Sequence, residues 1–106
     1  MNDLYYVYML RCADNSIYTG VTTDPARRER EHTEKSDTHA RYTIAHRGVR
    51  FECVWVTLGR SLAQKLEWRI KRLTHEQKEQ LIACPDLFRT LFSDPDPALF
   101  SVWERP

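Results

Sequence analysis

The sequence of 106 residues lacks several features that mark membrane and secreted proteins. No apolar run approaches the roughly 20 residues that a membrane-spanning helix needs, and the first residues have neither the basic nor the apolar region of a secretory signal. Internal repeats, low-complexity tracts and linkers are missing as well, and the length suits one domain with one core. We therefore expect a cytoplasmic protein that does not enter a membrane.

Cysteine is scarce, with only Cys12, Cys53 and Cys84 in the chain. An odd number of thiols about 30 to 40 residues apart is more typical of reduced, isolated side chains than of a disulfide framework or a zinc site. His39 and His46 have no cysteine nearby in the sequence with which to form a zinc knuckle. We therefore interpret the three thiols as structural.

A large net charge is also missing, because the total is only +1, but the charges are unevenly distributed. Residues 27–78 hold 13 Lys and Arg against 7 Asp and Glu, and the remainder holds 3 basic and 8 acidic residues. Clustered basic charge attracts polyanions such as nucleic acids. A well-solvated surface explains the same distribution equally well.

The apolar and turn-forming residues predict an α+β fold in the order β-β-α-β-α-α, with a small three-stranded antiparallel sheet flanked by helices. Aromatic and β-branched segments at 5–10 and 17–21 flank a cluster of turn formers and predict a hairpin. A third strand is predicted over 51–58. We expect residues 1–85 to form the main domain and residues 86–106 to form a helical and extended tail packed on it, anchored by Phe100 and Trp103.

Two later helices are predicted from their caps and their apolar spacing. Ser61 with Gln64, and Thr74 with Gln77, have the spacing of capping boxes. The first of these helices carries a core-facing stripe, formed by Leu62, Leu66, Ile70 and Leu73. The second is short and ends near residue 84.

By contrast, the helix predicted to start at Pro25 has almost nothing apolar to bury. Asp24 suits the N-cap and Pro25 the first helical position, which predicts a helix to about Lys35. Apart from the proline, Ala26 is its only apolar residue. A helix that is polar on all sides is either a solvated bridge or a surface presented to a partner.

Two side chains of this polar helix, Arg28 and His32, are four residues apart and therefore share a face. This face begins close to where the second strand is expected to end. The alternative is that Arg28 pairs with Glu31 or Asp24 and that His32 is an ordinary surface imidazole.

Five side chains follow an ordered pattern: Tyr8 in Val7-Tyr8-Met9, Tyr18 in Tyr18-Thr19-Gly20, Arg28 ten residues later, His32 four further, and Glu67 in Ala63-x-x-x-Glu67-x-x-x-Lys71. In order, spacing and placement they resemble the GIY-YIG nuclease superfamily, most closely its small, stand-alone bacterial branch, over roughly residues 4–82. The first motif lacks the family's glycine, and Thr19 stands where the family has isoleucine. Both tyrosines and Gly20 are kept, so these departures concern the local backbone more than the chemistry.

The resemblance implies a divalent-metal-dependent endonuclease that hydrolyses phosphodiester bonds in DNA, with a role in DNA repair or processing. It implies that Glu67 ligates a single Mg²⁺ or Mn²⁺, an ion that keeps several waters and needs few protein ligands. Arg28 would bind the phosphate with its permanently charged guanidinium. Tyr8 would act as the base for the attacking water, with Tyr18 beside it. His32 would either relay a proton or position Tyr8.

Each of these residues also has an ordinary structural explanation. Tyr8 and Tyr18 at opposed strand positions are alternatively a cross-strand aromatic pair. Glu67 and Lys71 are alternatively a helical surface ion pair worth roughly 0.3 to 0.5 kcal/mol. The alternative function is a nucleic-acid-binding module that keeps the fold but has no turnover.

The side chains expected to contact nucleic acid are cations with one aromatic among them: Arg27, Lys35, Arg41, Tyr42 and Lys71. Such cations suit a phosphate backbone, and Tyr42 suits stacking on a base. A solvated loop over residues 33–50 is the equal alternative. The expected partner is DNA, whether single-stranded, duplex or branched, and RNA and a targeting protein are further candidates.

Overall fold

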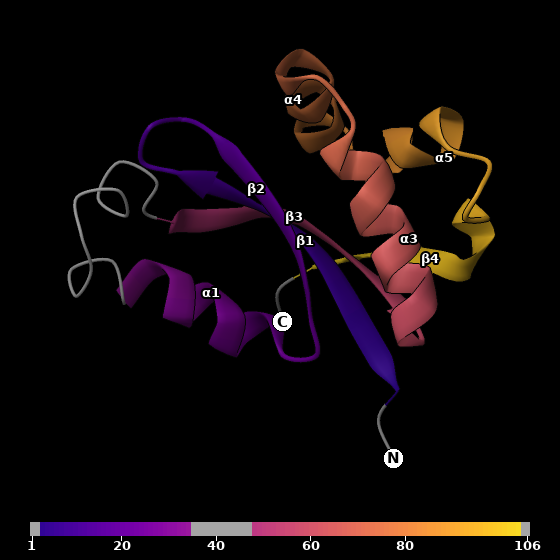
Figure 1. Cartoon of the computed structure of the whole chain (residues 1–106), viewed down its shortest axis with the longest axis horizontal. Helices are drawn as coiled ribbons and strands as arrows, with labels where there is room; N and C mark the ends of the chain where they lie inside the picture. The colour runs from indigo at the N-terminus through magenta and orange to yellow at the C-terminus, as the bar shows by residue number, and fades with distance from the viewer. Residues whose placement is uncertain (1–2, 35–47, 105–106) are drawn as a thin grey trace.

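A four-stranded antiparallel sheet forms the centre of the computed structural model, which describes residues 3–34 and 48–104 (Figure 1). The strands lie in the order β2-β1-β3-β4. Their bounds are β1 Leu4–Cys12, β2 Ile17–Thr22, β3 Gly48–Leu58 and β4 Phe100–Trp103. The predicted hairpin is present, because β1 and β2 pair antiparallel around a turn in which Asn15 has a positive φ of 69°.

The fourth strand corrects the sequence prediction of a three-stranded sheet. β4 pairs with β3 at the sheet edge, with Trp103 opposite Val54 and Phe100 opposite Thr57. The strand is only four residues long, and its partner lies far away in the sequence. No turn signal connects the two strands, so local sequence patterns do not reveal this pairing.

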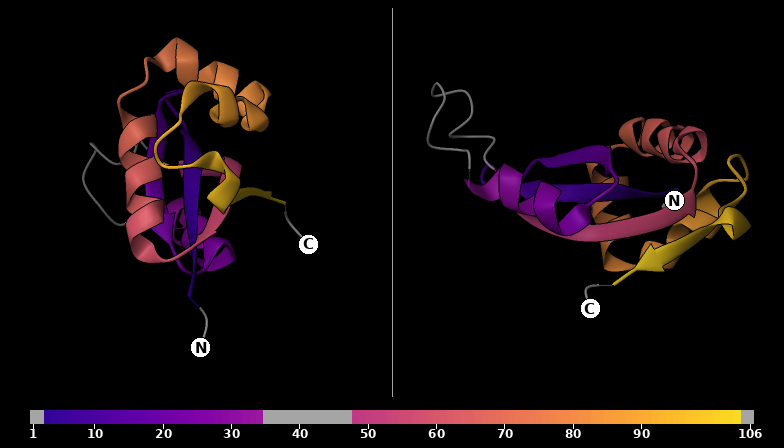
Figure 2. Two further views of the ribbon diagram at one scale, coloured as in Figure 1. Left: turned by 90° about the vertical axis from the view of Figure 1, so that its right-hand side faces the viewer. Right: turned by 90° about the horizontal axis from the view of Figure 1, so that it is seen from below.

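Four α-helices surround the sheet in the described part of the chain: α1 Pro25–Glu34, α3 Arg60–Lys71, α4 His75–Ala83 and α5 Phe88–Leu91. Short 3₁₀ turns at Pro85–Leu87 and Pro97–Leu99 link the C-terminal pieces. α1 lies at one end of the molecule and α4 and α5 at the other, while α3 crosses one side of the sheet (Figures 1 and 2). None of the described helices has the length and apolarity that crossing a membrane requires.

The two capping-box signals gave one confirmed and one wrong prediction. Thr74 and Gln77 form the predicted capping box at the start of α4, with both reciprocal hydrogen bonds present. Ser61 and Gln64 do not form one, because α3 begins at Arg60, two residues before the start that an N-cap at Ser61 predicts. Its N-cap is Gly59, whose φ of 92° suits glycine and which has no side chain to cap the helix.

The sheet has a different apolar cluster on each face, because side chains alternate along a strand. The larger core joins Val7, Met9 and Trp55 to the helices and to β4; its other buried members are Cys53, Ala63, Leu66, Ile70, Leu81, Phe88 and Phe100. The smaller cluster on the opposite face contains Tyr8, Leu10, Cys12, Phe51 and Val54. All three cysteines are free thiols, and Cys84 is exposed.

Candidate active site

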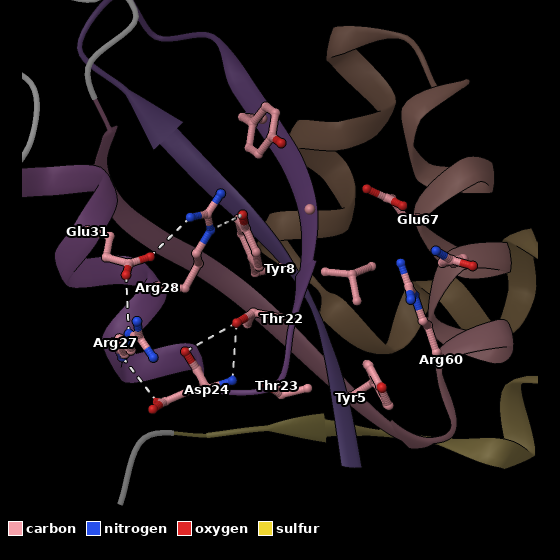
Figure 3. A pocket seen from close by; sticks show the side chains of 14 residues that line it. Tyr5, Tyr8, Thr22, Thr23, Asp24, Arg27, Arg28, Glu31, Arg60 and Glu67 are labelled. Atoms are coloured by element: carbon pink, nitrogen blue, oxygen red, sulfur yellow. Dashed lines mark hydrogen bonds and ion pairs between the residues drawn. The ribbon is translucent and has the colours of Figure 1, made fainter. Parts of the chain in front are cut away.

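An open cleft of about 540 Å³ lies beside β2, between α1 and α3 (Figure 3). Arg28 and Glu31 approach it from α1, and Glu67 and Arg60 approach it from the other side, on α3. The full lining consists of Tyr5, Tyr8, Tyr18, Gly20, Val21, Thr22, Thr23, Asp24, Arg27, Arg28, Glu31, Arg60, Gln64 and Glu67. The cleft therefore collects polar and charged groups from a hairpin and two helices.

Tyr8 reaches this cleft from the central strand because its partner on β2 is glycine. The register places Tyr8 opposite Gly20, and a Cβ atom at Gly20 would lie 2.6 Å from the Tyr8 Cζ atom. Any larger residue at position 20 would therefore displace the ring. Tyr18 is opposite Leu10, so Tyr8 and Tyr18 are diagonal neighbours and not the opposed pair that the sequence suggested; their ring centroids are 6.2 Å apart.

The Tyr8 hydroxyl is held by two groups of α1. It lies 2.9 Å from the His32 Nε2 atom and accepts a hydrogen bond of 3.4 Å from the Arg28 Nε atom. Phe51 stacks on the Tyr8 ring with a centroid distance of 4.4 Å, which fixes the ring plane. Burial raises the pKa of Tyr8 above its ordinary value, and the Arg28 hydrogen bond opposes that rise. Tyr8 is therefore a protonated phenol at neutral pH.

His32 is a neutral imidazole in this environment. Burial lowers its pKa, the charge of Arg28 lowers it further, and Glu31 acts in the opposite direction. When its proton is on Nδ1, the Nε2 atom accepts the Tyr8 hydroxyl hydrogen. The start of β3 packs close behind it, because a Cβ atom at Gly48 would lie 3.0 Å from the His32 Cβ atom.

Glu31 positions both neighbouring guanidinium groups. Its carboxylate accepts from Arg28 Nη1 at 3.0 Å and from Arg27 Nε at 3.2 Å. The ordinary explanation of Arg28 as a partner of Glu31 is thus correct as a contact. The same arginine also bonds Tyr8 and lines the cleft, so this ion pair does not remove it from the site.

The polar helix α1 is attached to the sheet by polar contacts and has no apolar stripe. Asp24 caps it by accepting from the Arg27 backbone N–H at 3.2 Å, and Pro25 is its first residue, as predicted. The Glu29 carboxylate accepts from the Phe51 backbone N–H at 2.7 Å, next to a register shift in the pairing of β1 with β3. An irregularity in the ladder leaves backbone groups available. This bond and those to Tyr8 fix the helix.

Glu67 faces the cleft from α3 and is paired with a cation. Its carboxylate lies 3.2 Å from the Lys71 Nζ atom, as the ordinary explanation expects. Lys71 also lies over the Tyr18 ring, 6.0 Å from its centroid. The charge of Glu67 acts on Tyr8 and contributes to raising the pKa of that phenol, which places the two groups in one electrostatic site.

The donors around Glu67 fit a divalent ion only when other ligands complete its shell. Among the described residues, no cluster of three or more His, Cys, Asp and Glu side chains could hold a metal ion. Gln64 lies one turn before Glu67 on α3 and lines the same cleft, so one carboxylate and one amide oxygen are available. Mg²⁺ and Mn²⁺ accept such hard ligands when waters and phosphate oxygens supply the rest. The donor set therefore suits an ion bound together with a phosphate.

The structure brings most of the predicted site residues to one place. Tyr8, Tyr18, Arg28 and Glu67 line the cleft, and His32 contacts Tyr8 behind it. Of the predicted nucleic-acid contacts, Arg27 lines the cleft and pairs with Glu31, and Lys71 pairs with the cleft residue Glu67. The other predicted contacts, Lys35, Arg41 and Tyr42, lie outside the described residues, as do His39 and His46.

Glu31 was expected only as a partner of Arg28, and several other residues of the site were not predicted from the sequence. The spacing of Glu31 to Arg27 and Arg28 at four and three residues signals the double ion pair. Arg60 and Gln64 precede Glu67 by seven and three residues and so share its helical face. The Phe51 stack on Tyr8 has no local signal, because it depends on the pairing of distant strands.

This chain is similar to known proteins over most of its length. Residues 4–80 match the family model described as the GIY-YIG catalytic domain. The UPF0213 protein FN1575 of Fusobacterium nucleatum subsp. nucleatum is 46% identical over 84 residues, which cover 79% of this chain and 82% of that protein. The UPF0213 protein YhbQ of Salmonella arizonae is 41% identical over 90 residues, or 84% and 87% of the two chains.

A solved relative is the solution NMR structure of the UPF0213 protein BH0048 from Bacillus halodurans. It is 38% identical, with 76% of this chain and 83% of that chain covered and a TM-score of 0.48. The family model spans both tyrosines, the α1 pair and Glu67. This chain belongs to the GIY-YIG family.

Proposed function

We propose that this protein is a divalent-metal-dependent endonuclease that hydrolyses phosphodiester bonds in DNA, in a cytoplasmic repair or processing reaction. One observation carries the proposal: the Tyr8 hydroxyl is held between His32 and Arg28 in an open cleft that Glu67 also lines. Phosphodiester hydrolysis needs an activated water, a charge clamp on the phosphate and help for the leaving oxygen. The cleft offers a residue for each task.

Tyr8 and His32 form the route for the proton of the attacking water. Tyr8 alone is a poor base, because burial keeps its pKa above the ordinary value. His32 lies 2.9 Å from the hydroxyl and is neutral, so it accepts the Tyr8 proton as Tyr8 accepts one from water. Arg28 stabilises the negative charge that develops on the Tyr8 oxygen during this transfer.

Arg28 is also the clamp for the phosphate. Its planar guanidinium matches two phosphate oxygens and does not deprotonate. Arg27 and Arg60 line the same cleft from opposite helices and add positive charge on both sides of the bound strand. The negatively charged phosphate backbone of a nucleic acid is thus attracted into the cleft that Tyr8 lines.

Glu67, with Gln64 beside it, would hold the divalent ion. When bound, the ion supplies Lewis-acid stabilisation of the leaving oxygen. Lys71 must release the carboxylate or share it for this to occur, because the two are now 3.2 Å apart. A released Lys71 is free to contact a phosphate oxygen. When substrate and metal ion replace the ion pair, Glu67 therefore pairs with the ion and Lys71 with the phosphate, and neither charge is left unpaired.

The same Lys71 contact favours the second candidate function, a nucleic-acid-binding module without turnover. If the Glu67–Lys71 pair stays closed, the cleft still attracts a phosphate backbone but has no carboxylate for an ion. The two candidates therefore differ in one measurable property, which is metal-dependent cleavage that requires Glu67.

The test incubates labelled single-stranded, duplex and branched DNA, and RNA, with the protein in Mn²⁺, Mg²⁺ or EDTA. We expect products only with metal, and we expect Glu67→Gln to slow cleavage by about 10²-fold or more. The matched control is Glu76→Gln, an exposed carboxylate in the first turn of α4, which should cleave like the unchanged protein.

Binding without products in every metal condition would overturn the enzyme and support the module. Cleavage by Glu67→Gln at the unchanged rate would remove Glu67 from the site. Salt provides a further check, because phosphate contacts make affinity fall steeply between about 50 and 200 mM. A flat response in that range contradicts a phosphate-binding cleft.

A further inference from the structure

Trp68 follows Glu67 on α3 and is an exposed indole that belongs to neither apolar cluster of the described residues. Its residue surface is 52% exposed, although tryptophan carries one of the largest apolar side chains. Two guanidinium groups hold the ring in place: the Cζ atom of Arg72 lies 4.5 Å and that of Arg69 lies 5.2 Å from the ring centroid. The ring is thus exposed to solvent with two cations beside it.

A second depression, of about 290 Å³, lies beside this ring. It is lined by Ser61, Gln64, Lys65, Trp68, Asp94 and Pro95. Gln64 lines the candidate active site as well, so the two hollows meet at that side chain. Among the described residues, neither arginine that holds the ring lines the depression, so one part of the indole is free to receive a ligand.

The loop that forms the far part of the depression is tied to α3. Arg69 donates to the Asp94 backbone carbonyl at 2.9 Å, and its guanidinium lies 3.5 Å from the Asp94 carboxylate. The acidic group of the depression is therefore partly neutralised. Pro95, which follows it, is buried against the domain and gives the hollow an apolar ring besides the indole.

The charge of α3 indicates what this surface attracts. Residues 60–72 contain five cations and a single acid, Glu67. A protein partner that simply buried Trp68 would have to desolvate these cations or carry a matching acidic patch. A nucleic acid supplies a partner for both kinds of side chain, because its bases stack on the indole and its phosphates pair with the cations.

We infer that Trp68 is the stacking platform for an unpaired base, next to the phosphate that occupies the candidate active site. This inference rests on the proposed function, because it assumes that a nucleic-acid strand lies in the cleft. Gln64 stands between the two hollows, where a strand passes from one to the other. Lys65 lines the depression and pairs with a phosphate of that strand. The substrate class is consequently DNA with a single-stranded nucleotide beside the cleaved bond.

The experiment measures equilibrium binding in EDTA, so that it does not depend on cleavage. The probes are a fluorescein-labelled single-stranded oligodeoxynucleotide, the same strand with abasic residues, and a blunt duplex, all read by anisotropy. We expect Trp68→Ala to weaken binding of the intact single strand by about 5- to 150-fold, the range found for loss of one base–aromatic stack. Trp68→Phe should retain most of the affinity.

The abasic strand isolates the stacking contribution. The unchanged protein and Trp68→Ala should bind it equally, and they should also bind the duplex equally, because its bases are already stacked. Leu99→Ala is the matched control, since Leu99 is also 52% exposed but lies outside both hollows. Far-UV circular dichroism checks that every variant is folded.

Several outcomes would overturn the inference. These are unchanged binding by Trp68→Ala, an equal loss on the abasic strand or on the duplex, and no measurable binding of the single strand. A dimer in the unchanged protein that Trp68→Ala converts to a monomer would assign the indole to self-association instead. Because none of these readouts needs turnover, an inactive protein that passes them would overturn the nuclease and leave the stacking platform in place.

Discussion

Arg11 and Arg28 are two arginines beside the sheet whose donors are used in opposite ways. Arg11 donates from all three nitrogens: Nε to Glu52 at 3.0 Å, Nη1 to Asn15 and Glu79, and Nη2 to Glu79 at 2.6 Å. Arg28 donates from Nε to Tyr8 and from Nη1 to Glu31, and within the described chain nothing accepts from its Nη2. The Arg11 side chain is only 10% exposed, whereas the Arg28 side chain is 41% exposed at the cleft.

The difference separates a structural guanidinium from one that is available to a ligand. Arg11 joins β1, the hairpin turn, β3 and α4, and its partners raise its pKa above the ordinary value by bonding the charged form. Removing it would leave Glu52 and Glu79 without their main cation. Arg28 keeps donors that point into an open cleft, so a phosphate can bind it without breaking the fold.

Substitution of Arg28 should break the active site and leave the fold intact. We expect Arg28→Ala to reduce kcat/KM for DNA cleavage by about 10²- to 10³-fold, since it removes a charged donor from the transition state. Arg28→Lys should lie between, because an ammonium keeps the charge but loses the fork. The free energy of unfolding in urea should change by only about 1 kcal/mol, because Arg28→Ala removes a partly exposed ion pair and one long hydrogen bond to Tyr8, while His32 and Glu29 still attach the helix.

The control for this prediction is Arg30→Ala on the same helix. Arg30 is exposed and does not line the cleft, so its removal should leave cleavage unchanged. Full activity in Arg28→Ala, or equal losses in the two variants, would contradict the role assigned to Arg28.

Substitution of Arg11 should do the reverse. We expect Arg11→Ala to lower the free energy of unfolding by about 3 kcal/mol, because in a partly buried cluster it leaves Glu52 with only the exposed Arg50 and Glu79 with only His75. The value is at the low end for such pairs, since the Glu79 side chain is 35% exposed. Urea denaturation measures the loss, and kcat/KM per folded molecule should remain near that of the unchanged protein. A loss of activity without a loss of stability would reverse the comparison.

Much of the fold could be predicted because its signals are local. Asp24 with Pro25 fixes the start of α1, and Thr74 with Gln77 fixes that of α4. The start of α3 was misplaced because Gly59, with its positive φ, allows the helix to begin without a side-chain cap. β4 was not predicted because it forms by pairing with β3, a contact between distant parts of the chain that leaves no local signal in the sequence.

The side-chain contacts divide in the same way, into those with a local sequence signal and those between distant parts of the chain. The polar face of α1 could be predicted from its spacing, as could the pairing of Glu67 with Lys71. The Arg11 cluster could not, since its partners lie 41 and 68 residues away and the sequence offers many other carboxylates. The stacking of Phe51 on Tyr8 depends on a register shift between two strands, which periodicity cannot show.

The pH dependence of cleavage sharpens the comparison through histidine. Burial and the charge of Arg28 lower the pKa of His32. The acid limb of the pH profile, where kcat/KM falls as the pH decreases, should therefore have its midpoint below the pKa of free imidazole, ~6.5. As the pH falls through that lowered pKa, His32 becomes charged and cannot accept the Tyr8 proton, so activity is lost on the acid side and is intact at neutral pH. Glu31→Gln should move the limb to lower pH, because Glu31 raises the pKa of His32.

The control is His75→Gln, because His75 contacts Glu79 in the Arg11 cluster at 3.1 Å and does not line the cleft. It should leave the acid limb where it is. Initial rates from about pH 5 to 8 give the profile. A limb at or above the value for free imidazole, or one that follows His75, would remove His32 from the proton route.

The smallest expected effect concerns Thr19, which lies between two cleft residues on β2 but faces the core opposite Met9. It is 2% exposed, and its hydroxyl has no hydrogen-bond partner among the described residues. Thr19→Val keeps the shape of the side chain and removes an unsatisfied polar group. The free energy of unfolding, measured by urea denaturation, should therefore rise by about 1 kcal/mol. Thr57→Val is the matched opposite, because that buried hydroxyl donates to the Leu99 carbonyl at 2.8 Å and its loss should destabilise the fold. A destabilised Thr19→Val would show that the hydroxyl is satisfied after all, whereas stabilisation with unchanged cleavage would separate the core side of β2 from its cleft side.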